Sequence, residues 1–380
     1  ERKPDWLLGF PAQIYCNRRH DMKKEKSLAR SVIKHAPSSQ AHMSGPAVAA
    51  VAAVSILVLF SPQFLSNYRL NLIVSILTTA YLAQCWNLMS GLAGQFSFGH
   101  AAFFGLGAYT SSLLYSDFGV TPWIGMFAGM AVAGIVGAFI GLLSFRYRLR
   151  GDYFALATLA FAEILRVIAN NTEALHAAQG IMIDYSRDIS VMQFPSRAGY
   201  VYMAFIMLAL ITFLIFKLHR SRTGLYFVAI RENEDAAGAL GINAFKYKML
   251  ALVMSAMLTA LAGTFYAQYY KFVDPTIAFG STVSINAIIP CIVGGVGTIF
   301  GPILGAAIIE PISELTNAYL SAFAGMNMVV YGIILATVII LMPKGVDGLI
   351  RSIAEKFAAK HTAALEVTKG ERTDGAADSI

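Results

Sequence analysis

Six long stretches of this chain contain no charged side chain, and they constrain its fold more than any other feature. Each stretch is free of Asp, Glu, Lys and Arg and is bordered by charged residues. They are Leu70–Ser116, Phe118–Phe145, Ala198–Phe216, Met249–Tyr270, Pro275–Ile309 and Leu315–Pro343. A helix needs about 20 apolar residues to cross a bilayer, so each stretch has room for one or two crossings.

The composition argues against a soluble fold and favours helices over a β-barrel. Of the 380 residues, 57% are hydrophobic and 13% are charged, whereas soluble domains carry about 25% charged residues. Barrel strands alternate apolar and polar residues, but runs such as AVAGIVGAFIGLLSF (Ala131–Phe145) do not alternate. The sequence therefore predicts an all-α, polytopic membrane protein of about ten transmembrane helices, some of them broken and Gly-rich.

The positions of lysine and arginine orient the expected helices, because cytoplasmic loops carry an excess of both residues. With a cytoplasmic N-terminus and alternating crossings, 24 of the 29 fall on the cytoplasmic side. Both termini are therefore predicted to be cytoplasmic. The expected spans are 44–61, 70–90, 96–116, 122–145, 152–169, 199–218, 247–270, 282–297, 301–320 and 326–343.

Three regions follow from this topology. Residues 1–43 are basic, lack the apolar core of a signal peptide and are predicted to form a disordered cytoplasmic extension, with Met22 or Met43 as alternative starts. Residues 44–343 form the transmembrane domain in membrane lipid, and 344–380 a cytoplasmic tail. Topology explains the net charge of +7, so no nucleic acid is expected. The three cysteines show no CxxC spacing, so neither a disulfide framework nor a metal site is expected, and no cofactor is expected.

The long cytoplasmic loop, Arg222–Lys248, carries a helix-start pattern. Asn233 is a favourable N-cap, and Glu234 and Asp235 in the first turn complement the helix dipole. Gly241 suits the end of such a helix. The pattern predicts a short surface helix near 234–240 that offers a docking face to another protein, and a loop that only links two spans is the alternative. The expected apolar face consists of Ala236, Ala237 and Leu240.

The Gly-rich segment Ser90–Leu114 interrupts an apolar run. Broken helices at membrane depth occur where they face protein or a water-filled cavity, and their free backbone groups can bind the charged ends of a solute. Close packing of helices through glycine is the alternative, and for His100 a packed side chain is favoured over a metal ligand. The residues predicted to line a translocation path are Gly94, Gln95, Ser97, Gly99 and His100, with Glu163 from another span.

A few charges fall within the expected spans. Glu163 and Arg166 are three residues apart and can pair on one helical face. Glu310 and Glu314 are expected to reach the outer mouth of their span. A charge inside the membrane is a functional candidate, although local pairing is the simpler interpretation for the first pair.

The segment GGVGTIFG (Gly294–Gly301) is interpreted as a tight turn between two packed spans. No Walker A sequence, GxxxxGK[ST], occurs in the chain. The chain is therefore not expected to be an enzyme or to hydrolyse ATP by that route.

Several ordered segments resemble one transporter family over about residues 65–345. GLAGQFSFGHAAFFGLGAY (Gly91–Tyr109) is similar to a segment of the LivM-type permeases of branched-chain amino acid ABC importers. Further matches are RLRGDYFALATLAFAEILRVIANN (Arg148–Asn171), TGLYFVAIRENEDAAGALGIN and the region Gly263–Ile308. Asp235-Ala236-Ala237, followed after three residues by Gly241, resembles the EAA signature of importer permeases, with Asp in place of Glu and without the usual downstream Pro.

The resemblance implies a permease subunit of the bacterial inner membrane that moves an amino acid. Its implied partners are two ABC ATPase subunits, a second homologous permease and a periplasmic solute-binding protein. The segment that resembles the EAA signature is then the coupling helix that docks on an ATPase. The residues implied in coupling are Arg231, Glu232, Asn233, Glu234, Asp235, Ala236, Ala237, Leu240 and Gly241.

Other functions remain open at this point. The same family also takes up urea, short amides and aromatic acids. An ion-coupled secondary transporter would need membrane-buried carboxylates, and only Glu163, Glu310 and Glu314 qualify. A multi-pass enzyme would need catalytic carboxylates or histidines at metal-ligand spacing, which the sequence does not offer.

Overall fold

The structure is a computed structural model that describes residues 57–186 and 188–320, with 329–330, 332–333, 336–337, 345–346 and 348. The predicted extension 1–43, most of the tail 344–380, and most of the first and last expected spans lie outside the described residues. Within the described part the chain is mainly helical, as predicted.

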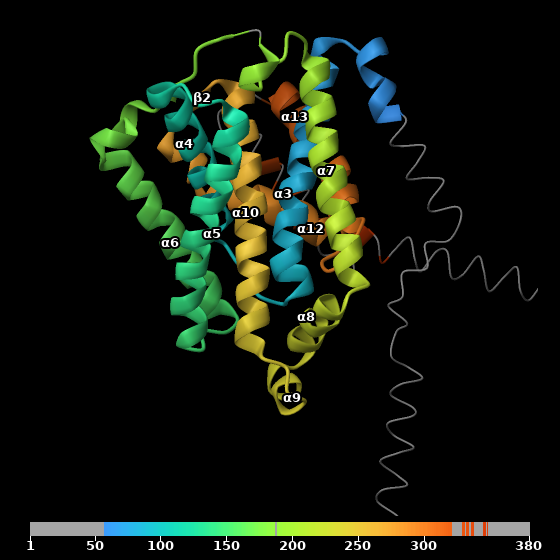
Figure 1. Cartoon of the computed structure of the whole chain (residues 1–380). Coiled ribbons are helices and arrows are strands. Elements are labelled where there is room, and N and C mark those ends of the chain that lie inside the picture. The colour runs from blue at the N-terminus through green and yellow to red at the C-terminus, as the bar shows by residue number, and fades with distance from the viewer. Residues whose placement is uncertain are drawn as a thin grey trace, which may run out of the picture. The chain divides into compact units, whose positions relative to one another are not determined.

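Eight long helices form the bundle in Figure 1, and their bounds lie close to the expected spans. They are α3 (Asn67–Trp86), α4 (His100–Phe118), α5 (Pro122–Arg146), α6 (Asp152–Asn171), α7 (Arg197–His219), α10 (Ala244–Tyr270), α12 (Ser281–Gly294) and α13 (Gly301–Leu320).

Short elements connect these helices. They are a π-helix (Asn87–Leu92), α8 (Arg222–Glu232), α9 (Glu234–Ala239), α11 (Pro275–Ala278), three 3₁₀ turns (Glu173–Leu175, Ala177–Gln179 and Ile189–Val191) and the strands β1 (Ile181–Met182) and β2 (Phe272–Val273).

Five helices in the described part are long and apolar enough to cross a membrane. They are Asn67–Leu92, Pro122–Arg146, Arg197–His219, Ala244–Tyr270 and Pro275–Gly294. Helices α4, α6 and α13 are 19 or 20 residues long but carry more polar or charged side chains. The architecture is thus that of a polytopic α-helical membrane protein.

The expected span 96–116 begins later than predicted. Residues 93–99 are not helical, and α4 starts at His100. The preceding helix instead continues from α3 into the π-helix Asn87–Leu92. The Gly-rich segment is therefore a true break between two helices.

Helix α10 is central and packs against α3, α4 and α5. Two glycines allow its close approach to α4. A Cβ atom on Gly107 would lie 2.0 Å from the carbonyl oxygen of Ala260, and one on Gly263 would lie 2.0 Å from that of Phe104. Small residues at such crossings bring helix backbones together in membranes.

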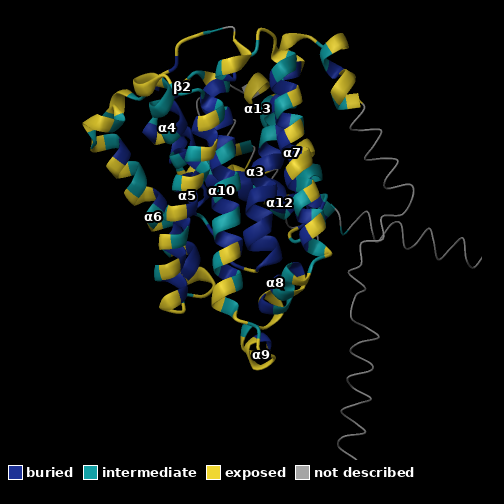
Figure 2. Cartoon of the chain, in the orientation of Figure 1, coloured by how far each residue is buried: buried dark blue, intermediate teal, exposed yellow. Residues whose placement is uncertain are grey.

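The exposed face of the bundle is apolar. Figure 2 shows exposed residues along α5, α6 and α7 and buried ones on α3 and α10. Ile135 and Phe139 of α5 and Leu210 and Phe213 of α7 are all more than half exposed. Such faces suit contact with lipid or with another membrane subunit.

The bundle has two distinct ends, which we call the α9 end and the β2 end (Figure 1). At the β2 end, β1 and β2 pair antiparallel, with Ile181 opposite Val273. Trp123 Nε1 donates a hydrogen bond to the carbonyl oxygen of Ile189 (2.9 Å). These contacts join segments that are far apart in the sequence.

Candidate functional site

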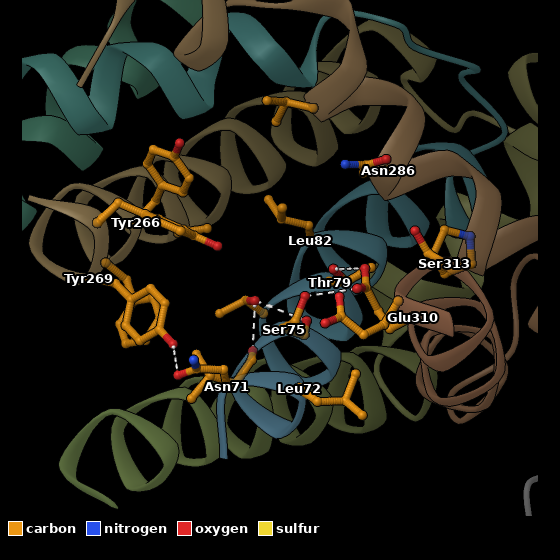
Figure 3. A pocket seen from close by; sticks show the side chains of 18 of the residues that line it. Asn71, Leu72, Ser75, Thr79, Leu82, Tyr266, Tyr269, Asn286, Glu310 and Ser313 are labelled. Carbon is orange, nitrogen blue, oxygen red and sulfur yellow. Dashed lines mark hydrogen bonds between the residues drawn. The ribbon is translucent and has the colours of Figure 1, made fainter. Parts of the chain in front are cut away.

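A cavity of about 610 Å³ lies among α3, α10, α12 and α13, a volume typical of small-molecule sites. Helix α10 contributes residues from Ala262 to Tyr270, its last part, and α7 contributes its first residue, Arg197. Both helices run between the two ends of the bundle, so the cavity lies towards the β2 end. Figure 3 shows polar and aromatic side chains around it.

One wall of the cavity is a polar ridge on α3. Asn71, Ser75 and Thr79 are spaced four residues apart, so their side chains lie on one face of the helix. Glu310 of α13 accepts hydrogen bonds from Ser75 Oγ (2.8 Å) and Thr79 Oγ1 (2.6 Å), as Figure 3 shows. Each carboxylate oxygen is thus held by one hydroxyl, which fixes this half-buried side chain at the cavity wall.

A second wall is aromatic and comes from α10. Tyr266 and Tyr269 lie across the cavity from Glu310 in Figure 3. Tyr269 Oη donates a hydrogen bond to Asn71 Oδ1 (2.8 Å), and Arg197 Nη1 donates to the same Asn71 oxygen and to Tyr269 Oη (3.2 Å). A guanidinium therefore lies at the Asn71 end of the ridge, and a carboxylate lies one to two helical turns further along it.

Apolar side chains complete the cavity. They include Leu82 of α3, Phe104 of α4, Phe265 of α10 and Ile309 of α13. A site with a few placed polar groups among apolar ones binds small molecules in a defined orientation.

None of the six residues predicted for a translocation path lines this cavity. Glu163 lies on an exposed face of α6 and forms the expected ion pair with Arg166, at 2.7 Å. His100 is fully buried, and its Nε2 lies 2.9 Å from Ser255 Oγ, which donates to the backbone of Cys85 (2.7 Å). This histidine is packed between helices, as the alternative interpretation held.

The other predicted path residues stabilise the break at 93–99. The carbonyl oxygen of Gln95 accepts from Ser90 Oγ (2.9 Å), and that of Ser97 accepts from Trp86 Nε1 (2.8 Å). A Cβ atom on Gly99 would meet Thr158 at 2.9 Å. In these contacts, packing of the turn explains the pattern better than a solute-facing surface does.

Two glycine turns meet at Arg231, the residue two positions before the N-cap of α9. Arg231 Nη1 donates to the carbonyl oxygen of Gly91 (2.8 Å). The stem of Arg231 lies against Gly94, where an added Cβ would be 2.5 Å from Cγ, and its Nη1 would be 2.8 Å from a Cβ on Gly297. We call this contact of Arg231 with the two turns the arginine junction.

Asn87 in the π-helix ties the same two turns together. Its Oδ1 accepts from the backbone N–H of Gly297 (2.7 Å), and its Nδ2 donates to the carbonyl oxygen of Thr298 (2.8 Å). The segment Gly294–Gly301 is thus the tight turn between α12 and α13 that the sequence predicts. Together with the arginine junction, it packs the helices closely near the α9 end.

The short helix predicted near 234–240 is observed as α9. Asn233 Oδ1 accepts from the N–H of Ala236 (3.0 Å), and Gly241 adopts a φ of +85° after the helix. The predicted apolar face is wrong in one respect, because Ala237 is buried at 3% exposure. Helix α9 packs against α8 and α10, which covers Ala237 and leaves Ala236 and Leu240 exposed.

Ion pairs fix the first turn of α9 to its neighbours. Arg150 Nε lies 3.2 Å from Glu234 and its Nη2 lies 3.1 Å from Asp235, while Lys248 Nζ lies 2.5 Å from Glu234. The hydrogen bond and the charge of Arg150 hold the pKa of Asp235 below its ordinary value. Helix α9 is therefore tied both to the α5–α6 connection and to α10.

Apolar helices around a partly polar cavity, with a small exposed helix at one end, define a class of membrane transport subunit. Residues 68–339 match the family model described as "Branched-chain amino acid transport system / permease component". This match covers more than half of the chain, so the chain belongs to that family.

Individual relatives agree with the family match. The chain is 32% identical over 286 residues to the "High-affinity branched-chain amino acid transport system permease protein LivM" of Salmonella typhimurium, and 31% identical to the Escherichia coli protein of that name. Both alignments cover 68% of this chain and 65% of the relative. The permease protein LivH of Salmonella typhimurium is 26% identical over 292 residues, with 71% and 91% covered.

Sequence reasoning missed the cavity ridge. Asn71, Ser75 and Thr79 stand in a charge-free stretch, and their polar atoms were not distinguished from the apolar background. The four-residue spacing was the signal that could have found them. Glu310 was noted for its position in a span, but its partners on α3 lie more than 200 residues away in the sequence.

Proposed function

We propose that this chain is a permease subunit of an ABC importer that carries branched-chain or other small hydrophobic amino acids across the bacterial inner membrane. Membership of the family supports the permease role. The observation that carries the proposal is the position of the cavity, which lies towards the β2 end while the helix packing at the α9 end is tight. That arrangement suits a path that is open on one side of the membrane and closed on the other.

In this proposal the α9 end is cytoplasmic, and α9 is the coupling helix that docks on an ATPase. The concentration of basic residues there, such as Arg146, Arg148 and Arg150, supports this orientation. The chain then has about ten spans and both termini in the cytoplasm. The full importer contains two ATPases, a second homologous permease and a periplasmic solute-binding protein that docks at the β2 end.

The arginine junction offers a physical route from α9 to the helices. Arg231 belongs to α8, only two residues before the N-cap of α9, and contacts both glycine turns. A displacement of α9 by the ATPase would move Arg231 and release the carbonyl group of Gly91. The closely packed turns near the α9 end would then separate, and the cavity would open towards the cytoplasm.

The decisive experiment is uptake by the purified importer in proteoliposomes. We expect radiolabelled leucine to enter only when the solute-binding protein is outside and ATP is available to the ATPases. Urea, acetamide and benzoate serve as the competing solutes for the other family substrates. Uptake of one of these in place of leucine would overturn the amino acid assignment.

The same vesicles test the ion-coupled alternative. A secondary transporter would accumulate solute in response to a proton or sodium gradient without ATP. Gradient-driven uptake in the absence of the ATPases would therefore overturn the ABC assignment, whereas uptake that requires ATP would support it.

A further inference from the structure

We infer that the cavity recognises both charged groups of a free α-amino acid, with Glu310 as the site for the ammonium group and Arg197 as the site for the carboxylate. This inference rests on the proposed function, because it names the chemical class of solute for that permease path. It also separates amino acids from the amides, urea and carboxylic acids that lack one of the two charges.

Glu310 is a carboxylate held ready for a cation. Among the described residues it forms no salt bridge, and its two hydrogen bonds come from the neutral hydroxyls of Ser75 and Thr79. A carboxylate can accept about four hydrogen bonds, so capacity remains for the three donors of an ammonium group. A half-buried charge within a span is costly unless it pairs, and a bound ammonium would supply the missing charge.

Arg197 offers the complementary group. It lines the same cavity, and no salt bridge to it is found among the described residues. Its Nη1 is used by Asn71 and Tyr269, but a guanidinium carries five N–H donors. The remaining donors can bind a carboxylate in the two-pronged manner that arginine favours.

The spacing of the two groups fits an amino acid. Arg197 contacts the ridge at Asn71 and Glu310 contacts it at Ser75 and Thr79, which lie about 6 and 12 Å further along a helix that rises 1.5 Å per residue. A solute whose ammonium and carboxylate lie about 3 Å apart, with a hydrogen bond of about 3 Å at each end, spans roughly 9 Å. The ridge therefore places the two charges at a separation that one α-amino acid can bridge.

The remaining wall suits an apolar side chain. Leu82, Phe104, Phe265 and Ile309 contribute no charge to the cavity. A branched aliphatic side chain would pack against them, whereas a charged side chain would be desolvated without a partner.

The test is solute binding to the permease–ATPase complex in nanodiscs, measured by saturation-transfer NMR without the solute-binding protein. The three probes are leucine, leucinamide, which lacks the carboxylate, and 4-methylpentanoate, which lacks the ammonium group. The variants are Arg197→Gln and Glu310→Gln. Asp152→Asn is the control, because it removes an exposed carboxylate from the α9 end of α6.

We expect the wild-type complex to bind leucine about 10- to 100-fold more tightly than either analogue, as the loss of a charge-assisted hydrogen bond predicts. Arg197→Gln should abolish the preference of leucine over leucinamide and keep that over 4-methylpentanoate. Glu310→Gln should do the opposite, and Asp152→Asn should change neither ratio. This crossed pattern cannot arise from general unfolding, which thermal melting of each complex checks independently.

Two results would overturn the inference and leave the proposed function intact. The first is ATP-dependent leucine uptake by the full importer with both binding ratios unchanged in the two variants. The second is leucine uptake without leucine binding by the wild-type complex. Absence of uptake of any branched-chain amino acid by the wild-type importer would instead refute the proposed function.

Discussion

At the scale of single residues, glycine at the arginine junction has two separate roles. Gly94 adopts a φ of +69°, and the stem of Arg231 occupies the position that a Cβ atom would take. A substitution there meets backbone strain and a steric clash together. Gly119 allows these to be separated, because its φ is +64° and no atom lies within 4 Å of its added Cβ.

We expect Gly94→Ala to uncouple ATP hydrolysis from uptake, because the added Cβ displaces Arg231 from Gly91. Gly119→Ala shares only the backbone strain, which costs about 1–2 kcal/mol, and should retain coupling. The measurement is the ratio of solute transported to ATP hydrolysed in proteoliposomes. Equal ratios in the two variants would show that the arginine junction has no part in coupling.

Asp235 provides a prediction about protonation. Its pKa is lowered mainly by Arg150, so the ionised form and its link to Arg150 persist at neutral pH and are lost as the pH falls through the lowered pKa. Arg150→Gln should raise the pKa of Asp235 towards its ordinary value. Carbon-13 NMR of labelled aspartate side chains during a pH titration measures this, and an unchanged titration would show that the pair does not form in solution.

At the scale of secondary-structure elements, α9 presents a different docking surface from the one its sequence suggests. Ala237 is buried, whereas Ala236 and Leu240 are exposed. The alternation was invisible in the sequence, because a six-residue helix has no period long enough to assign its faces. Contact with α8 and α10 decides which alanine is covered.

The two alanines therefore make a matched pair of variants. Ala236→Trp should prevent assembly with the ATPases and leave the melting temperature of the isolated permease unchanged. Ala237→Trp should lower that melting temperature, because overpacking a buried site costs about 1–3 kcal/mol. Co-purification and thermal melting measure the two effects, and the reverse assignment would contradict the orientation of α9.

At the scale of the whole molecule, the sequence predicted the helices well and their mutual contacts poorly. Charge-free stretches marked most helix ends within a few residues, because charged residues rarely lie in the bilayer core. The cavity was not predictable, since Glu310 and Thr79 are distant in the sequence and meet only through the packing of α13 on α3. The apolar faces of α5 and α7 look the same in sequence whether lipid or protein covers them.

The proposed orientation gives a prediction for the two ends of the molecule. In a background with Cys16→Ser, Met182→Cys should react with a membrane-impermeant maleimide in intact spheroplasts, because Met182 is 80% exposed at the β2 end. Leu240→Cys, at a position 83% exposed on the α9 side, should react only after permeabilisation. The native Cys85 and Cys291 are buried. Labelling of Leu240→Cys in intact spheroplasts would invert the topology.

The π-helix at Asn87–Leu92 makes the register of this protein sensitive to the length of one turn. A π-helix contains wider, i→i+5 hydrogen-bonded turns, whereas each residue of an α-helix turns the chain by about 100°. Removing one residue from this turn would let α3 continue as a regular α-helix, and everything after it would rotate by about that angle. Gly94 would then face away from Arg231, so a single deletion would separate the two ends of the molecule mechanically while every helix remained intact.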